Sequence, residues 1–101
     1  MISIIFPTYN EQDNLDALYG RLVQSVGRLS HQTFEFIFVD DCSSDRTVEI
    51  LKGLREKDAR VKIIRFARNC GGHAAITAGL QHAKGECAVA LAADLQDPPE
   101  I

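Results

Sequence analysis

The sequence predicts an α/β protein built on a Rossmann-like parallel sheet with helices on both faces. Four short apolar segments alternate with three longer segments of helical periodicity, and the connections between them are short. The apolar segments are nearly continuous, as expected for strands buried on both faces, whereas a one-sided sheet would alternate apolar and polar residues. Alternating strands and helices favour parallel pairing through right-handed crossovers, so the expected order of elements is βαβαβαβ.

Four strands are expected where the apolar segments stop at turn-forming or charged residues. They cover residues 2–6, 34–39, 61–66 and 87–92. The second is rich in aromatic and β-branched residues, which suits a strand. The fourth stops abruptly at an acidic cluster followed by two prolines.

Three helices are expected between these strands, because apolar residues recur there every three or four positions. Their inward-facing residues are Leu15, Leu18, Leu22, Val26 and Leu29 in the first, Val48, Leu51 and Leu54 in the second, and Ile76, Leu80 and Ala83 in the third. Asn10 is the predicted cap of the first helix, with Glu11 and Asp13 in its first turn. The candidate caps of the second helix are Ser43, Ser44 and Asp45. The third helix is expected from about residue 73 to residue 83.

The composition is that of one globular domain. The chain has 101 residues, of which 46% are hydrophobic and 25% charged, and these fractions are ordinary for a soluble protein. A net charge of −3 without blocks of like charge indicates neither a nucleic-acid partner nor an anionic membrane. Cys42, Cys70 and Cys87 form no CxxC pair, so we expect a reduced, cytosolic setting in which they act as small packing residues. No apolar segment reaches the roughly 18 residues that span a bilayer.

Polar residues gather at the carboxyl ends of three of the four predicted strands. Residues 7–11 (Pro-Thr-Tyr-Asn-Glu) follow the first strand, Asp40 and Asp41 the second, and Asp94 and Gln96 the fourth. In a parallel sheet these ends share one rim, where open α/β sheets bind ligands. An aromatic face with carboxylates suits a nucleobase, and hard oxygen ligands suit Mg²⁺ or Mn²⁺ beside a diphosphate. A nucleotide is therefore the favoured ligand.

Several of these residues also have a purely structural alternative. Tyr9 can cover the edge of the core, and Glu11 can complement the dipole of the first helix. Asp40 or Asp45 can cap the second helix, and for Asp45 capping is the favoured role.

Two further groups of residues have weaker signals. Gly71 and Gly72 open the third helix and could receive a phosphate, but without a GxxxxGK pattern they are predicted to be turn glycines. His31, His73 and His82 lack metal-ligand spacing and are predicted surface or turn residues, with a ligand contact left open for His73 alone.

Six motifs in a fixed order point to a known family. They are Phe6-Pro7-Thr8-Tyr9-Asn10-Glu11, Val39-Asp40-Asp41-Cys42-Ser43-Ser44-Asp45, Asn69-Cys70-Gly71, Ala78-Gly79-Leu80, Ala83-Lys84-Gly85 and Ala93-Asp94-Leu95-Gln96-Asp97-Pro98-Pro99-Glu100. The set resembles the nucleotide-binding half of the family 2 glycosyltransferases with the GT-A fold, and most closely the polyprenyl- or dolichyl-phosphate sugar transferases. The resemblance implies the strand order 3-2-1-4. It also implies that residues 1–101 are the nucleotide-sugar-binding half of a domain that continues beyond this chain.

The resemblance assigns roles to individual residues at the rim. It implies that Pro7, Tyr9 and Glu11 line the nucleoside pocket. One of Asp40 and Asp41 would contact the base, and Asp41 is the favoured one.

The same resemblance implies a divalent cation, Mg²⁺ or Mn²⁺, held by Asp94 with help from Gln96. The family has an aspartate at the first position of its D-x-D motif, whereas this chain has Ala92 there. Metal binding would therefore rest on Asp94, Gln96, phosphate oxygens and water.

The implied reaction transfers a sugar, with inversion, from a UDP- or GDP-linked donor to an acceptor, with polyprenyl phosphate favoured. No catalytic residue is assigned within residues 1–101, and this part alone is expected to be inactive. The enzyme would work at the cytoplasmic face, with any membrane anchor in segments outside this chain. Ala92 keeps open the alternative of a non-catalytic nucleotide-binding or scaffold relative. A receiver-type signalling domain is disfavoured, because its acidic pair follows the first strand and not the second.

The strand at residues 87–92 is expected at an edge of the sheet. It contains no charged residue or proline that would block pairing with another chain. Self-association of residues 1–101 is therefore expected.

Overall fold

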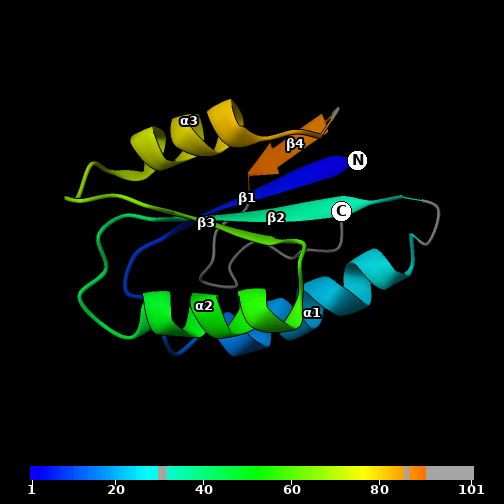
Figure 1. The fold of residues 1–101 in the computed structure, drawn as a ribbon, viewed down its shortest axis with the longest axis horizontal. Coiled ribbons are helices and arrows are strands. Elements are labelled where there is room, and N and C mark those ends of the chain that lie inside the picture. The colour runs from blue at the N-terminus through cyan, green and yellow to red at the C-terminus, as the bar shows by residue number, and fades with distance from the viewer. Residues whose placement is uncertain (30–31, 86, 91–101) are drawn as a thin grey trace.

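The computed structural model describes residues 1–29, 32–85 and 87–90, which form a four-stranded sheet between two layers of helices (Figure 1). The elements are β1 (Ile2–Thr8), α1 (Leu15–Gly27), β2 (Phe34–Asp40), α2 (Thr47–Lys57), β3 (Val61–Arg65), α3 (Gly72–His82) and β4 (Cys87–Ala90). All pairings are parallel, and the strand order is β3-β2-β1-β4. The predicted fold class and strand order are confirmed.

The two central strands, β1 and β2, are buried on both faces, which explains their nearly continuous apolar sequence. One face of β2 presents phenylalanines such as Phe36 and Phe38 to the core formed with α1 and α2. The other face presents Ile37 and Val39 to a smaller core that contains Ala75 of α3. Figure 1 shows α3 on one side of the sheet and both other helices on the opposite side.

The register of the central strands places their carboxyl ends at the same level. Thr8, the last residue of β1, pairs with Asp40, the last residue of β2. The first two strands run further than predicted, because the parallel ladder continues through Pro7 to Thr8. The third ends at Arg65, one residue earlier than predicted. Residues 91 and 92 of the predicted fourth strand lie outside the described residues.

The start of α1 differs from the prediction. The helix begins at Leu15, and its N-cap residue, Asn14, makes no side-chain capping bond. Asn10 therefore does not cap this helix, and it adopts a left-handed conformation with φ of 52°. The physical reason is that the polar groups of residues 10–12 form hydrogen bonds to the loop before α2, so they do not cap α1. Glu11 and Asp13 consequently precede the first turn, and Leu29 lies beyond the helix and is 39% exposed.

The inward face of α3 was predicted only in part. Ala83 packs against the smaller core, as predicted, but Leu80 is 53% exposed, whereas Ala75 is fully buried. Gly79 is buried against β1, where an added Cβ would lie 2.5 Å from Ile5 Cγ2. The backbone of α3 thus approaches the sheet so closely that small residues face it, and a pattern of large apolar residues does not reveal this.

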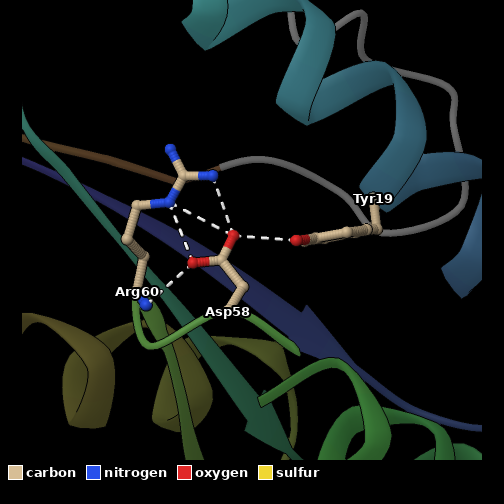
Figure 2. Close-up of polar contacts among 3 residues, drawn as sticks. All are labelled: Tyr19, Asp58 and Arg60. Carbon is tan, nitrogen blue, oxygen red and sulfur yellow. Dashed lines mark hydrogen bonds and ion pairs between the residues drawn. The ribbon is translucent and has the colours of Figure 1, made fainter. Parts of the chain in front are cut away.

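A polar cluster joins α1 to the loop between α2 and β3 (Figure 2). The Tyr19 hydroxyl donates to Asp58 Oδ2 over 2.8 Å, and Arg60 donates to the same carboxylate through Nε and Nη2. The Arg60 guanidinium also lies 5.0 Å from the centroid of the Phe36 ring, a cation–π distance. The cluster stabilises the amino end of the sheet, opposite the predicted rim.

Candidate functional site: the rim at the carboxyl ends of β1 and β2

The loops that follow β1 and β2 form one hydrogen-bonded unit. The backbone N–H of Asn10 donates to Ser43 Oγ over 2.9 Å, and Asn10 Oδ1 accepts the N–H of Ser44 over 2.9 Å. The N–H of Glu11 donates to Thr47 Oγ1, also over 2.9 Å. The left-handed conformation of Asn10 directs both its backbone and its side chain toward the second loop. Two sequence segments predicted to meet at the rim are therefore in direct contact.

Asp45 connects the same two loops at the start of α2. Its carboxylate accepts the backbone N–H of Thr47 over 2.9 Å and that of Gln12 over 3.3 Å. Burial raises the pKa of Asp45, but the hydrogen bonds from Thr47 and Gln12 outweigh it and leave the pKa below its ordinary value. Asp45 thus satisfies the first N–H of α2, in agreement with its favoured role, although Arg46 occupies the N-cap position itself.

Asp40 is fully buried beneath the rim. Its carboxylate accepts the backbone N–H of Ser43 over 3.0 Å and also the Ser43 hydroxyl. Its carbonyl accepts the N–H of Phe66 over 2.9 Å. These bonds shape the tight turn after β2, in which Cys42 has a φ of 61°. The Asp40 side chain supports the rim from below and has no surface of its own there.

Asp41 holds the loop that leads into α3. Its carboxylate accepts the backbone N–H of Cys70 over 2.6 Å and that of Gly71 over 2.9 Å, and only 6% of the residue is exposed. Its own N–H donates to the carbonyl of Thr8 over 2.9 Å. Asp41 therefore links β1, β2 and the start of α3. The sequence indicated the contact between Asp41 and this loop only indirectly. The N–H groups at a helix start need an acceptor, but the sequence does not specify which residue provides it.

The other predicted pocket residues differ in exposure. Tyr9 is 48% exposed and does not belong to the hydrophobic core, so its ring does not cover the core edge. Pro7 and Glu11 are half-buried, and the Glu11 carboxylate accepts a bond of 3.0 Å from Asn14 Nδ2. The ring of Tyr9 is thus the accessible aromatic surface at this rim.

The predicted metal ligands, Asp94 and Gln96, lie outside the described residues, as does Ala92. Within residues 1–29, 32–85 and 87–90, no group of three or more His, Cys, Asp or Glu side chains could hold a metal ion.

Other sequence predictions meet the structure in part. His73 and His82 are exposed, as predicted, and His31 lies outside the described residues. Cys42 is half-buried, but Cys70 is exposed and so is not a packing residue. The reason is that Cys70 lies in the loop held by Asp41 and not under a helix. In the part of the chain that the structure describes, no helix is long and apolar enough to cross a membrane.

Comparison with known proteins shows the family of this chain. The sequence profile of glycosyl transferase family 2 matches residues 3–100. The chain belongs to glycosyl transferase family 2. The predicted resemblance is confirmed at the level of the family.

Two curated proteins and one solved structure illustrate what the chain is similar to. The chain is 46% identical over 99 residues to the uncharacterized glycosyltransferase YkcC of Bacillus subtilis, and 43% identical over 100 residues to the undecaprenyl-phosphate 4-deoxy-4-formamido-L-arabinose transferase of Edwardsiella ictaluri. Each alignment covers 98% of this chain and 30% of the relative. Among solved structures, S. aureus TarS 1-349 in complex with UDP-GlcNAc superposes with a TM-score of 0.79 at 31% identity, over 92% of this chain and 26% of that one. The chain thus spans about 30% of the length of these curated relatives.

Proposed function

We propose that the full-length protein is an inverting glycosyltransferase that moves a sugar from a nucleotide-diphosphate donor to polyprenyl phosphate. Residues 1–101 would form the nucleotide-sugar-binding half of its GT-A domain. The observation that carries this proposal is the 43% identity, across 98% of the chain, to a transferase named for undecaprenyl phosphate.

The geometry of the rim supports a nucleotide donor. The exposed ring of Tyr9 offers a stacking surface for a base, and Pro7 and Glu11 flank it in sequence. Asp41 lies beside the same rim, and we assign it the base contact in addition to its bonds to Cys70 and Gly71. UDP-GlcNAc bound to the similar TarS structure supports a uridine nucleotide as the first donor to test.

Asp40 takes a different part in the proposed site. Because its carboxylate is fully buried against Ser43, it would act on the nucleotide by holding the turn that presents Asp41. A direct contact between Asp40 and the ligand would require that turn to open.

We further propose that Asp94, helped by Gln96, holds Mg²⁺ or Mn²⁺. Their carboxylate and amide oxygens suit either ion. When bound, the ion would neutralise charge on the diphosphate leaving group.

The acceptor side of the reaction is assigned to residues outside 1–101. A lipid phosphate is already ionised at neutral pH, so the protein would need to position it and not to deprotonate it. Such an acceptor also implies work at the cytoplasmic face of a membrane, with the lipid held by other parts of the protein.

The proposal is tested by incubating the full-length protein with labelled UDP- and GDP-sugars, polyprenyl phosphate and Mn²⁺. We expect one donor to give a lipid-linked product, and Asp94→Asn to abolish it. Glu49→Gln is the matched control, because that exposed carboxylate lies on α2 and pairs only with Arg46 among the contacts described. No product from any common donor, with nucleotide binding intact, would instead support a non-catalytic relative.

A further inference from the structure

A buried carboxylate at the amino end of the sheet contacts the turn that leads into β4. Glu35 of β2 is only 4% exposed. Its Oε2 accepts the hydroxyl of Ser3 over 2.5 Å and the backbone N–H of Lys84 over 2.6 Å. The Ser3 hydroxyl oxygen in turn accepts the N–H of Gly85 over 2.9 Å. The Ser3–Glu35 pair therefore binds two successive backbone N–H groups of this turn.

The turn approaches β1 more closely than a side chain would allow. A Cβ at Gly85 would lie 2.6 Å from Ser3 Oγ and 2.7 Å from both the Met1 carbonyl oxygen and the Ser3 nitrogen. Two of these three atoms belong to the backbone and cannot easily move aside. Close packing at Gly85 and hydrogen bonding by Glu35 thus hold the same point of the chain by independent means.

This point lies two residues before β4. Cys87 pairs with Ile2, and the register continues to Ala90 opposite Ile5. Within the described residues β4 is only four residues long and pairs with β1 alone. A slip of one residue would turn every side chain of a strand to the opposite face. So short a ladder needs an additional constraint on register, and the Ser3–Glu35 pair supplies one.

The Glu35 carboxylate is suited to this role because it is charged at neutral pH. Burial raises its pKa, but the bonds from Ser3 and from the backbone at Lys84 outweigh burial and lower the pKa below its ordinary value. Bonds from N–H groups to a carboxylate are stronger than those to a neutral acceptor.

We propose that Glu35 is a positioning residue: with Ser3 it fixes the register of β4 on β1. Asp94 follows Ala90 by four positions in the sequence, so the metal-dependent binding that the proposed function assigns to Asp94 should depend on this register. The inference rests on the proposed function for its consequence at the nucleotide, but its claim about β4 stands on the contacts alone. Glu35 itself lies at the amino end of the strands, opposite the rim, so it would act on the sugar nucleotide only through β4.

The test compares Glu35→Ala and Ser3→Ala with Asp58→Ala in the full-length protein. Asp58 is the matched control, because its carboxylate also accepts bonds at the amino end of the sheet but joins α1 to the loop before β3. Glu35→Gln is the conservative variant, since its amide oxygen can still accept the bonds from Ser3 and Lys84. If Glu35→Ala fails to fold, Ser3→Ala and Glu35→Gln keep the comparison informative.

Hydrogen exchange of the amides of residues 84–90 is the first measurement. In Glu35→Ala and Ser3→Ala we expect the exchange rates of these amides to rise at least tenfold more than those of the β2 amides. Glu35→Gln should exchange at a rate close to that of the wild type. Asp58→Ala should not accelerate exchange selectively in residues 84–90. Unchanged protection of residues 84–90 in Glu35→Ala would overturn the positioning role.

Titration with UDP and GDP, with and without Mn²⁺, is the second measurement. At a temperature where all variants are folded, Glu35→Ala should lose about tenfold in the metal-dependent affinity and little in the metal-independent affinity. An equal loss in Asp58→Ala would show a merely structural effect and overturn the inference. If the wild-type protein binds neither nucleotide, the proposed function is overturned, while the exchange result still decides the role of Glu35 in β4.

Discussion

The Asp41 carboxylate accepts the backbone N–H of Gly71 over 2.9 Å and thereby joins the end of β2 to the start of α3. Gly71 has a φ of 90°, a conformation that favours glycine, and it immediately precedes the first residue of the helix. Helix starts carry unpaired N–H groups and partial positive charge, and a carboxylate satisfies both. The residue proposed to contact a base therefore also holds the loop that leads into α3.

Removing this carboxylate should destabilise the fold as well as the site. Asp41→Ala leaves the N–H groups of Cys70 and Gly71 without their acceptor in a partly buried location. We expect a loss of about 2–4 kcal/mol in the free energy of unfolding, measured by urea denaturation. Asp41→Asn should lose less, because its amide oxygen can still accept.

Asp13→Ala is the control for this measurement. Asp13 is an exposed acidic residue near the same rim with no contact described, so its removal should change the free energy of unfolding by no more than about 0.5 kcal/mol. An Asp41→Ala variant as stable as Asp13→Ala would mean that water replaces the carboxylate at no cost.

Two glycine substitutions should have opposite effects on stability. Gly79→Ala places a Cβ 2.5 Å from Ile5 Cγ2, so α3 must move away from β1, at a cost of about 1–3 kcal/mol. Gly53→Ala in α2 meets no atom within 4 Å and should stabilise the helix by about 0.5–1 kcal/mol. Thermal denaturation of both variants checks the signs. A Gly79→Ala protein that melts above the wild type would contradict the close approach of α3.

The fold was predictable because burial on both faces leaves a strong signal in a sequence. Strands without polar alternation, separated by helical periodicity, have few arrangements available. The prediction of the inward face of α3 failed, because the packing there depends on the missing side chain of a glycine. Leu80 was placed inward by its spacing, but the close approach of Gly79 to Ile5 gives that face to small residues.

The meeting of the two loops at one rim was predictable, but the hydrogen bonds within it were not. The carboxyl ends of parallel strands lie at one edge, so topology placed Tyr9 and Asp41 at the same rim, and their roles toward a nucleotide remain predictions. The partners of Asp41 lie 29 and 30 positions away, and no local pattern indicates which N–H groups it meets. The role of Glu35 could not be predicted from the sequence for the same reason, since its carboxylate accepts a bond from a turn 49 positions away.

The Tyr19–Asp58–Arg60 cluster should make stability depend on pH in acid. Hydrogen bonds from Arg60 lower the pKa of Asp58 from 3.8 to about 2, against the opposing effect of burial. Because the folded-state pKa is depressed, this contribution is complete above about pH 4 and is lost as the pH falls toward 2. We expect about 1–2 kcal/mol, since Arg60 is 40% exposed and water screens the pair.

This dependence is measured as the difference in free energy of unfolding between the wild type and Asp58→Asn. The difference should be largest between pH 5 and pH 7 and should shrink by pH 3. Glu49→Gln is the control, because the Arg46–Glu49 pair is 76% and 71% exposed and should contribute no such trend. A difference that stays constant down to pH 3 would show that the Asp58 pKa is not depressed.

Asp94→Asn should abolish the effect of metal on nucleotide binding. The proposed ion offsets repulsion between the Asp94 carboxylate and the diphosphate, so wild-type affinity for UDP or GDP should rise when Mn²⁺ or Mg²⁺ is added. The asparagine variant removes the charge that attracts the ion. Isothermal titration with and without metal measures both affinities. The same metal-dependent gain in Asp94→Asn would refute the assignment of this ligand.

The 101-residue chain should self-associate through β4. Within the described residues β4 is an edge strand, and residues 87–90 contain no charge or proline to prevent pairing with a second copy. Ala88 is exposed, so Ala88→Lys adds a charge on this strand at little cost to the core, and Ala17→Lys makes the same change of charge on the exposed surface of α1. Light scattering at high micromolar concentration should give a mass above 11.2 kDa for the wild type and Ala17→Lys, and a monomer for Ala88→Lys. A wild-type chain that remains monomeric would show that its β4 edge is already protected.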